Sequence, residues 1–356
     1  MVESKHQWKA WLYLAPALIL LLIFTVWPII NTVSMAFQEG YDYSEILSNR
    51  AYNQQVDELH EKVEKFGLDD PTKEDYIDLS EWQHVDESPF KFGLGNFSAV
   101  LNSGDIGKIL WNTVFLCVLT VPLSTMLALL IAVALNSIKP LQKFLQTIYF
   151  LPYVTNSIAI GMVFYAMFNI IGANPDGSIG LQTSVGIFNE LIKLFGGEPV
   201  NWVNSGSQWG QNMTVMVIYI VWNALPFKIL VLLGGLQSVN KQYYEAARVD
   251  GTPRRRVFTK ITVPLLSPMI AYVVITGFIG GFKEYSSIVG IFDKDMGPPA
   301  TQGRPLDTMV GYIYSALEGT SDAAQGRASA AALILFAIIF AVTMVNLQVS
   351  KKKVHY

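Results

Sequence analysis

Residues 236–268 read LQSVNKQYYEAARVDGTPRRRVFTKITVPLLSP, a polar and basic stretch between two long apolar segments. Asn240 is expected to cap a first helix, and Gly251 suits the left-handed position that follows a helix. Thr252 is then expected to cap a second helix with Pro253 in its first turn, and Pro264 is expected to end that helix. The stretch is therefore predicted to form two short helices joined by a tight turn, and not a flexible linker.

Apolar segments flank this stretch and recur along the whole chain. Of the 356 residues, 51% are hydrophobic and only 15% are charged, which lies outside the range of ordinary soluble domains. A helix needs about 20 apolar residues to cross the hydrocarbon core of a bilayer. Six segments qualify: 10–37, 109–136, 144–170, 213–236, 265–292 and 328–350. The sequence therefore predicts an all-α polytopic membrane protein with six transmembrane helices.

The first apolar segment is expected to be a retained helix and not a cleaved signal. It is longer than the apolar region of about 7–15 residues that a secretory signal carries, and no small-residue cleavage site follows it. The predicted organisation places the N-terminus and first span at 1–37 and an acidic extracytoplasmic insert at 38–105. A five-helix core follows at 106–350, and 351–356 form a basic tail.

Lysine and arginine gather on one side of these spans. Thirteen of the 25 lie in the N-terminus, in the loops at 137–143 and 237–262, and in the tail, opposed by only Glu3, Glu245 and Asp250. Cytoplasmic loops of membrane proteins are enriched in basic residues. Both termini and the 237–262 loop are therefore predicted to be cytoplasmic, in the inner (cytoplasmic) membrane of a cell.

The opposite side carries the acids. Residues 38–105 hold 16 Asp or Glu against five Lys or Arg. Leu59, Val63 and Phe66 have the spacing of one apolar helix face, so a small folded cap is expected there. Two roles stay open: a solvated acidic loop that its charge keeps out of the membrane, or a docking surface for an external partner.

The basic loop resembles a known family motif. Glu245, Ala246, Ala247, Gly251, Ile261 and Pro264 have the spacing of the EAA loop of binding-protein-dependent ABC transporter permeases. Val263 departs from the Leu that this family usually has before the proline. In that family the loop is the coupling helix that docks into a cleft of the cytoplasmic ATPase, so the resemblance implies that these six residues couple this chain to an ATPase.

Further segments resemble the carbohydrate-uptake branch of that family, related to maltose and glycerol-phosphate permeases: Gly95-Asn96-Phe97, Trp111-Asn112-Thr113, Phe150-Leu151-Pro152-Tyr153, Gly235-Leu236-Gln237-Ser238 and Tyr312-Ile313-Tyr314. The resemblance implies a heterodimer with a second permease subunit, two ATPase subunits or domains, and an extracytoplasmic solute-binding protein. Membrane lipid and a small glycan complete the expected partners, and nucleic acid is not among them.

Nothing in the sequence suggests that this chain is an enzyme. A phosphate-binding loop of the G-x-x-x-x-G-K-[ST] type is missing, since the single Gly107-Lys108 pair has Asn102 and Ile109 at the other two required positions. The four histidines are widely spaced, which leaves no metal site to predict. No catalytic residue and no cofactor are expected here, and ATP and Mg²⁺ are expected on the partner ATPase.

Three ionisable residues lie inside predicted spans: Lys228, Lys283 and Glu284. Such residues are costly in a membrane and usually face a cavity or a partner. Lys283 and Glu284 are adjacent, so on a continuous helix they would point about 100° apart and each would need another partner. A Lys228–Glu284 bridge, a Lys228 side chain extended towards the membrane surface, and a contact with solute all stay open.

The resemblance to maltose permeases also implies a solute path. It implies contacts at Tyr153 and Ser157 in the third span, at Asn223 and Phe227 in the fourth, and at Gly281 and Glu284 in the fifth. Asn156, Trp222 and Lys283 are chemically suitable neighbours, because sugars need hydrogen bonds for hydroxyls and aromatic faces for rings. Gly280, Gly281 and Glu284 stand where that relative has an aromatic residue and amides, so a maltose-type ligand does not follow.

The sequence thus favours the permease subunit of an ATP-driven importer of an oligosaccharide or related solute. A non-sugar solute such as glycerol phosphate is an alternative within the same class. An ATP-independent secondary transporter is another, but it would call for inverted repeats and intramembrane carboxylates. Glu284 is the only such carboxylate, and no repeat is evident.

Overall fold

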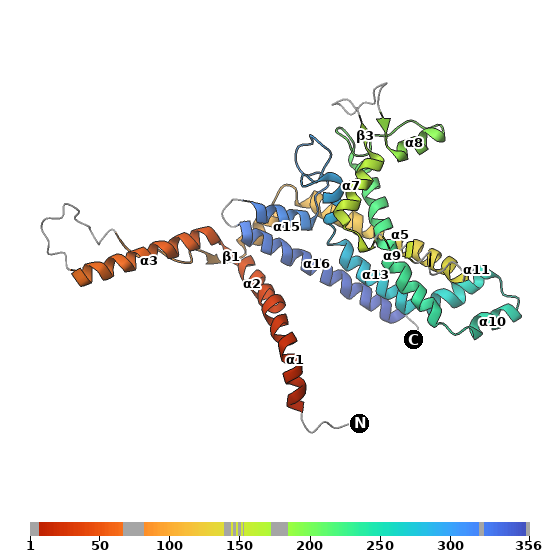
Figure 1. Cartoon of the computed structure of the whole chain (residues 1–356), viewed down its shortest axis with the longest axis horizontal. Helices are drawn as coiled ribbons and strands as arrows, with labels where there is room; N and C mark the ends of the chain where they lie inside the picture. The colour runs from red at the N-terminus through yellow and green to blue at the C-terminus, as the bar shows by residue number, and fades with distance from the viewer. Residues whose placement is uncertain are drawn as a thin grey trace. The chain divides into compact units, whose positions relative to one another are not determined.

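The computed structural model describes residues 7–66, 82–138, 144, 147–148, 151, 153–171, 184–319 and 324–353 (Figure 1). The chain forms two compact units. Residues 1–103 and 313–333 make the first, and residues 104–312 and 334–356 make the second. Helices α15 (Met309–Glu318) and α16 (Ala324–Lys353) each contribute to both units.

The first unit begins with a long apolar helix. It consists of α1 (Gln7–Leu21), a π-helical turn (Leu22–Val26) and α2 (Trp27–Ala36). Within Trp11–Ala36 the apolar side chains are largely exposed, and Phe24 and Trp27 are 73% and 66% accessible. A helix that exposes apolar side chains all round suits a surface covered by lipid tails or by a neighbouring subunit.

The insert is a folded element of this unit. Strand β1 (Gln38–Glu39) pairs antiparallel with β2 (Lys91–Phe92) and closes its base. Between the strands, α3 (Tyr43–Phe66) extends the predicted amphipathic helix, and Asn53 exchanges two hydrogen bonds with the backbone of Val85 at 2.8 and 2.9 Å. After β2, Asn96 of α4 (Gly95–Leu101) donates to the carbonyl of Ala36, which ties α4 to the end of α2.

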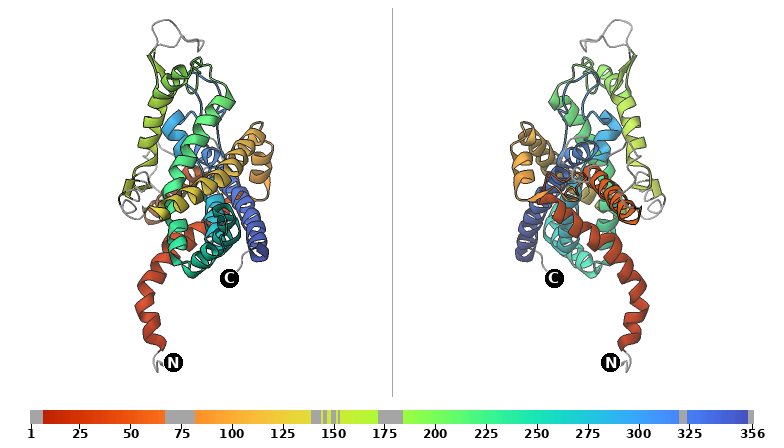
Figure 2. Two further views of the ribbon diagram at one scale, coloured as in Figure 1. Left: turned by 90° about the vertical axis from the view of Figure 1, so that its right-hand side faces the viewer. Right: turned by 90° about the vertical axis from the view of Figure 1, so that its left-hand side faces the viewer.

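The second unit is built on two long crossing helices, α5 (Ile106–Ser137) and α9 (Trp209–Ser238), which pack against each other (Figures 1 and 2). At 32 residues α5 is about 48 Å long, more than the roughly 30 Å of hydrocarbon in a bilayer. Leu116 of α5 and Met213, Met216 and Tyr219 of α9 are buried in one apolar cluster.

Shorter elements complete this unit. Between α5 and α9 lie α7 (Ser157–Phe168), the antiparallel pair β3 (Ile170–Ile171) and β4 (Ser184–Val185), and α8 (Ile187–Leu194). After α9 come α10 (Gln242–Val249), α11 (Arg254–Val257), a π-helical turn (Phe258–Thr262), α12 (Val263–Leu265), α13 (Ser267–Gly281) and α14 (Ser286–Phe292). The β3–β4 pair and α8 lie at one end of α9, and α10 lies at the other (Figure 1).

Four of the described helices are long and apolar enough to span a membrane: Trp11–Ala36, Ile106–Ser137, Trp209–Ser238 and Ala324–Lys351. They match the first, second, fourth and sixth predicted spans. The predicted third span, 144–170, contains the shorter apolar helix α7 and lies partly outside the described residues. The chain is therefore a mostly helical, multi-pass membrane protein.

The prediction of one continuous fifth span at 265–292 is wrong. Helix α13 stops at Gly281, inside the predicted span, and α14 begins only at Ser286. At the start of the predicted span, a bend of 68° at Leu266 separates α13 from the helical segment Arg254–Leu265. Glycine lowers helix stability by about 1 kcal/mol relative to alanine, and two glycines end α13 in sequence. The break leaves residues 282–285 non-helical before α14 begins.

Candidate functional site

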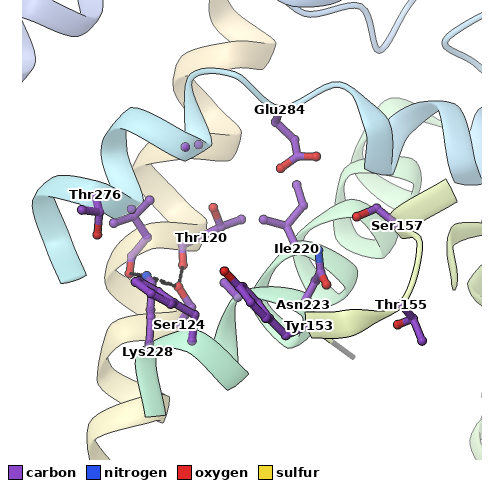
Figure 3. A pocket seen from close by; sticks show the side chains of 16 residues that line it. Thr120, Ser124, Tyr153, Thr155, Ser157, Ile220, Asn223, Lys228, Thr276 and Glu284 are labelled. Carbon is purple, nitrogen blue, oxygen red and sulfur yellow. Dashed lines mark hydrogen bonds between the residues drawn. The ribbon is translucent and has the colours of Figure 1, made fainter. Parts of the chain in front are cut away.

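A cavity of about 400 Å³ lies within the second unit, among α5, the segment leading into α7, α9 and α13 (Figure 3). Its walls combine hydroxyls, one amide, two aromatic rings and two charged groups. They are formed by Thr120, Val121, Ser124, Tyr153, Thr155, Ser157, Ile220, Asn223, Ala224, Phe227, Lys228, Thr276, Gly277, Gly280, Gly281 and Glu284. Helices far apart in the sequence thus meet around one polar space.

The aromatic wall of this cavity is a stacked pair. The rings of Tyr153 and Phe227 have centroids 6.1 Å apart and planes inclined by 18°. Asn223 lies four residues before Phe227, hence on the same face of α9. Aromatic faces beside an amide and several hydroxyls provide both kinds of contact that a sugar ring needs.

Six of the nine residues predicted for the solute path line the cavity: Tyr153, Ser157, Asn223, Phe227, Gly281 and Glu284. The other three lie elsewhere. The Asn156 carboxamide oxygen accepts from the backbone N–H of Ile158 at 2.8 Å, so this side chain caps α7. Trp222 packs on the ring of Phe164 in the apolar cluster, with centroids 5.2 Å apart, and Lys283 is exposed.

Lys283 and Glu284 do not lie on a helix, which corrects the prediction of two side chains 100° apart. Both residues belong to the break between α13 and α14. A carboxylate oxygen of Glu284 accepts from the backbone N–H of Ser287 at 3.3 Å, and its backbone carbonyl accepts from the Thr308 hydroxyl at 2.9 Å. Glu284 therefore helps to start α14 while its side chain reaches the cavity (Figure 3).

Lys228 is buried, with 4% of its surface exposed, and it links α9 to α5. Its ammonium group donates to the hydroxyls of Ser124 at 2.7 Å and Thr125 at 2.9 Å, and to the carbonyl of Val121 at 3.1 Å. An ammonium has three protons, and each has an acceptor here. The Lys228–Glu284 bridge considered from the sequence is thus replaced by hydrogen bonds within the helix pair (Figure 3).

Close helix packing beside the cavity depends on glycines whose packing role the sequence analysis did not predict. A methyl group on Gly281 would lie 2.9 Å from the Cys117 sulfur, and one on Gly277 would lie 3.0 Å from a methyl of Val121. Across the unit, α7 and α14 cross at Gly161 and Gly290, whose backbones are in contact. The spacing of Gly277 and Gly281, four residues apart in an apolar segment, is the signal that could have identified the first of these contacts.

The cavity also has polar residues that sequence reasoning did not select, among them Thr120, Ser124, Thr155 and Thr276. Thr120 and Ser124 are four residues apart and belong to the buried stripe of α5. Hydroxyl residues repeated at helical spacing in an apolar span were the available signal.

The predicted coupling loop is helical and lies at the end of α9 that is far from the β3–β4 pair (Figure 1). Glu245 and Ala246 are exposed on α10, whereas Ala247 is buried. Gly251 has φ of +63° and follows the helix as predicted. Val249 is 88% exposed, so an apolar side chain stands outward beside the turn.

Three details of this loop differ from the prediction. Asn240 accepts from Gln242 N–H at 3.0 Å but lies one residue before the N-cap, and the second helix is preceded by Pro253 instead of Thr252. Pro264 does not end that helix, because proline in a first turn leaves no hydrogen bond unmade. The chain continues through the π-helical turn, which holds Ile261, into α12.

Comparison with known proteins agrees with this geometry. Residues 121–354 match the family described as binding-protein-dependent transport system inner membrane component. The chain belongs to this family. The arabinooligosaccharides transport system permease protein AraP of Bacillus subtilis is 30% identical to this permease over 259 residues, which are 72% of this chain and 75% of that protein. The lactose transport system permease protein LacF of Rhizobium radiobacter is 26% identical over 317 residues, 88% of this chain and 85% of that protein.

The fold of this permease is also that of a solved transporter chain. A crystal structure of a bacterial ABC transporter involved in the import of the acidic polysaccharide alginate aligns with a TM-score of 0.67 at 20% identity, covering 98% of this chain and 96% of that one. The aligned length includes nearly the whole chain, so the architecture of both units has a counterpart of known structure.

Proposed function

We propose that this permease is one of two membrane subunits of an ATP-driven importer that translocates an oligosaccharide or related solute delivered by an extracytoplasmic binding protein. The observation that carries the proposal is the cavity in which stacked Tyr153 and Phe227 rings lie beside Asn223 and several hydroxyls. The family assignment and the arabinooligosaccharide and lactose permeases among the relatives support the same solute class.

The proposed topology has six spans and cytoplasmic termini in the inner membrane. The four long helices supply four spans, α13 and the residues that follow it supply the fifth, and the segment ending in α7 supplies the third. The concentration of Lys and Arg in the 237–262 loop and the tail supports this orientation. The organisation into a first span, an external insert, a five-helix core and a basic tail follows from it.

The proposed partners are a second permease and two ATPase subunits or domains that carry ATP and Mg²⁺. Glu245, Ala246, Ala247, Gly251, Ile261 and Pro264 form the proposed coupling region. Glu245 is exposed on the short helix α10, which ends in a left-handed turn at Gly251. This exposed helix and turn, here called the knob, support insertion into a cleft of the ATPase. Movement of that knob would tilt α9 and α13 and change access to the cavity.

The insert is the proposed contact for the binding protein. Its helix α3 exposes Asp57, Glu58 and Glu61, and the antiparallel pair β1–β2 anchors its base. An acidic surface of this kind suits a partner with a basic patch. The alternative is a purely solvated loop. Such a loop would not need the two hydrogen bonds between Asn53 and Val85 that hold the insert folded.

An anionic solute such as glycerol phosphate is less favoured by the cavity. Phosphate recognition calls for cationic donors that are free to bind it. Lys228 is the cation that lines the cavity among the described residues, and all three of its protons have acceptors on α5. A neutral saccharide needs no such charge.

Uptake by the reconstituted transporter tests the proposal. The chain, purified from its native host with whatever subunits accompany it, would be placed in proteoliposomes with its binding protein, and accumulation of labelled oligosaccharides measured with and without internal ATP. ATP-dependent accumulation is expected, together with co-purification of an ATPase and a second permease. A chain that purifies alone and moves solute equally without ATP would indicate a secondary transporter.

A further inference from the structure

A second cavity, of about 550 Å³, lies in the second unit at the end of α9 away from α10. It is bounded by the first turns of α5 and α9 and by the segment 302–305. Two tryptophans, Trp111 and Trp209, form part of its wall. Nothing in the proposed function so far uses this space.

Hydrogen bonds hold the floor of this second cavity, which is called the outer cavity below. Asn112 is only 2% exposed, and its carboxamide N–H groups donate to the carbonyls of Pro305 at 2.9 Å and Asp307 at 3.0 Å. Its carboxamide oxygen accepts from the indole N–H of Trp209 at 2.9 Å. One buried side chain therefore fixes both the orientation of the Trp209 ring and the position of the facing loop.

The loop is held independently as well. Arg304 forms an ion pair with Asp307 at 2.8 Å and donates to the carbonyls of Lys294 and Gly311. Asp307 is 3% exposed and also accepts from the backbone N–H of Thr308. The guanidinium is thus occupied with the loop itself, and the cavity does not present it as a free anion-binding group.

The groups that remain available suit a sugar. Trp111 is 60% exposed and provides an open aromatic face. Gln302 is exposed at the rim, and Lys108 and Asp105 form a loose surface pair at 3.4 Å. A pyranose or furanose stacks its apolar face on an aromatic ring and places its hydroxyls on amides and charged groups, which is the combination found here.

The outer cavity lies on the same stripe of α5 as the first. Asn112, Leu116 and Thr120 are spaced by four residues, so they share one face, and Asn112 lies about 12 Å along the helix axis from Thr120. Asn112 lines the outer cavity and Thr120 lines the inner one. Between them Leu116 is 1% exposed in the apolar cluster with Met213 and Met216.

We propose that the outer cavity is a saccharide subsite, in which Trp111 stacks on a sugar ring at the end of the oligosaccharide before the cluster around Leu116 opens towards the inner cavity. This subsite rests on the proposed function, because it assumes that the transported solute is a saccharide. The subsite predicts that transport depends on the length of the saccharide, because a chain long enough to reach both cavities gains an extra contact.

Uptake kinetics with saccharides of two lengths test the subsite. The complete transporter with its binding protein would be reconstituted in proteoliposomes and supplied with labelled di- and pentasaccharides built from arabinose, galactose or glucose. Trp111→Ala is expected to raise KM for the accumulated pentasaccharide about five- to tenfold and to change KM for the disaccharide less than twofold. Trp111→Phe, which keeps an aromatic face, should restore most of the loss.

The matched control is Trp27→Ala, since Trp27 is 66% exposed on α2 and lines none of the described cavities. It should leave both KM values unchanged. If Trp111→Ala reduces insertion into the membrane, Gln302→Ala at the rim replaces it, with a smaller rise of KM for the pentasaccharide alone.

Four results would overturn the subsite. An equal change of KM for both lengths would assign Trp111 to docking of the binding protein, and identical behaviour of the Trp111 and Trp27 variants would make it an ordinary interfacial tryptophan. If the wild-type transporter accumulates none of the saccharides, the proposed function fails and the subsite fails with it. Normal accumulation with no effect of either Trp111 variant removes the subsite alone.

Discussion

Replacing Gly281 by alanine probes the packing of α13 on α5. The added methyl group would lie 2.9 Å from the sulfur of Cys117, a residue with no exposed surface, and 3.4 Å from a methyl of Val121. Extra volume in a filled interior costs about 1–3 kcal/mol, and the better helix propensity of alanine offsets up to about 1 kcal/mol. The variant is therefore expected to lose about 1–2 kcal/mol of stability.

Gly280→Ala is the matched control, because a methyl group at Gly280 meets no atom within 4 Å. The assay is the midpoint temperature at which the purified protein in detergent ceases to be monodisperse on size exclusion. Gly281→Ala should lower the midpoint by several degrees while Gly280→Ala does not, and adding Cys117→Ala should restore at least half of the loss. Equal midpoints for the two glycine variants, or no rescue by the double substitution, would refute the close contact.

Three further predictions concern other parts of the chain. Gly251→Asp should leave insertion intact but abolish co-purification of the ATPase, because a side chain in a turn with φ of +63° both strains and blocks the proposed knob; retained co-purification and uptake would contradict it. Lys228→Met should keep saccharide uptake per inserted molecule within about threefold, since the Ser124 and Thr125 hydroxyls keep their hydrogen bonds to carbonyls of their own helix, whereas a hundredfold loss would make Lys228 a solute ligand. Arg304→Met should destabilise the chain by about 3 kcal/mol at neutral pH, because it leaves the Asp307 carboxylate buried without its partner. Burial raises the pKa of Asp307 in the folded chain while Arg304 acts to lower it, so the pKa of Asp307 rises further in the variant. A carboxyl group whose pKa is raised on folding costs stability as pH rises, so acidification should raise the melting temperature of the variant more than that of wild type.

Apolar length was sufficient to predict the long helices of the fold. Segments such as 109–136 and 213–236 hold enough apolar residues to cross a membrane, and helices cover them in the structure. The break after Gly281 could not be read from apolar composition. Two glycines weaken the helix at this point, and a partner distant in sequence contacts the break, since the Thr308 hydroxyl donates to the carbonyl of Glu284.

The family resemblance predicted residues that line the cavity, whereas residues added for their chemical type alone lie elsewhere. Asn223 lines the cavity, but the adjacent Trp222 faces the apolar cluster because successive residues on a helix point about 100° apart. Asn156 has the right chemistry for a sugar and is used instead to cap α7. Which polar side chain serves the backbone and which serves a cavity is decided by tertiary packing, and one sequence does not contain that information in a readable form.

The partners of Lys228 are also distant in sequence. The sequence left open a carboxylate partner, a position at the membrane surface or a solute contact for this lysine, yet Ser124 and Thr125 on the facing helix accept its hydrogen bonds. Hydroxyls at neighbouring positions on α5 also hydrogen-bond their own helix carbonyls, so their polarity was no clear sign of an interhelical role. A spatial contact between α5 and α9 was needed to see it.

The most direct test of the account is the effect of the stacked aromatic wall on transport. Phe227→Ala and Asn223→Ala would be compared with Phe336→Ala, a change at a 64% exposed phenylalanine of α16 outside the cavity lining, in ATP-driven uptake of the accumulated oligosaccharide. Loss of a ring contact worth about 0.5–1.5 kcal/mol should change KM up to about tenfold for Phe227→Ala, with the control unchanged and ATPase co-purification intact in all three. Unaltered KM in both cavity variants would contradict the central claim that the solute passes between α5, α9 and α13.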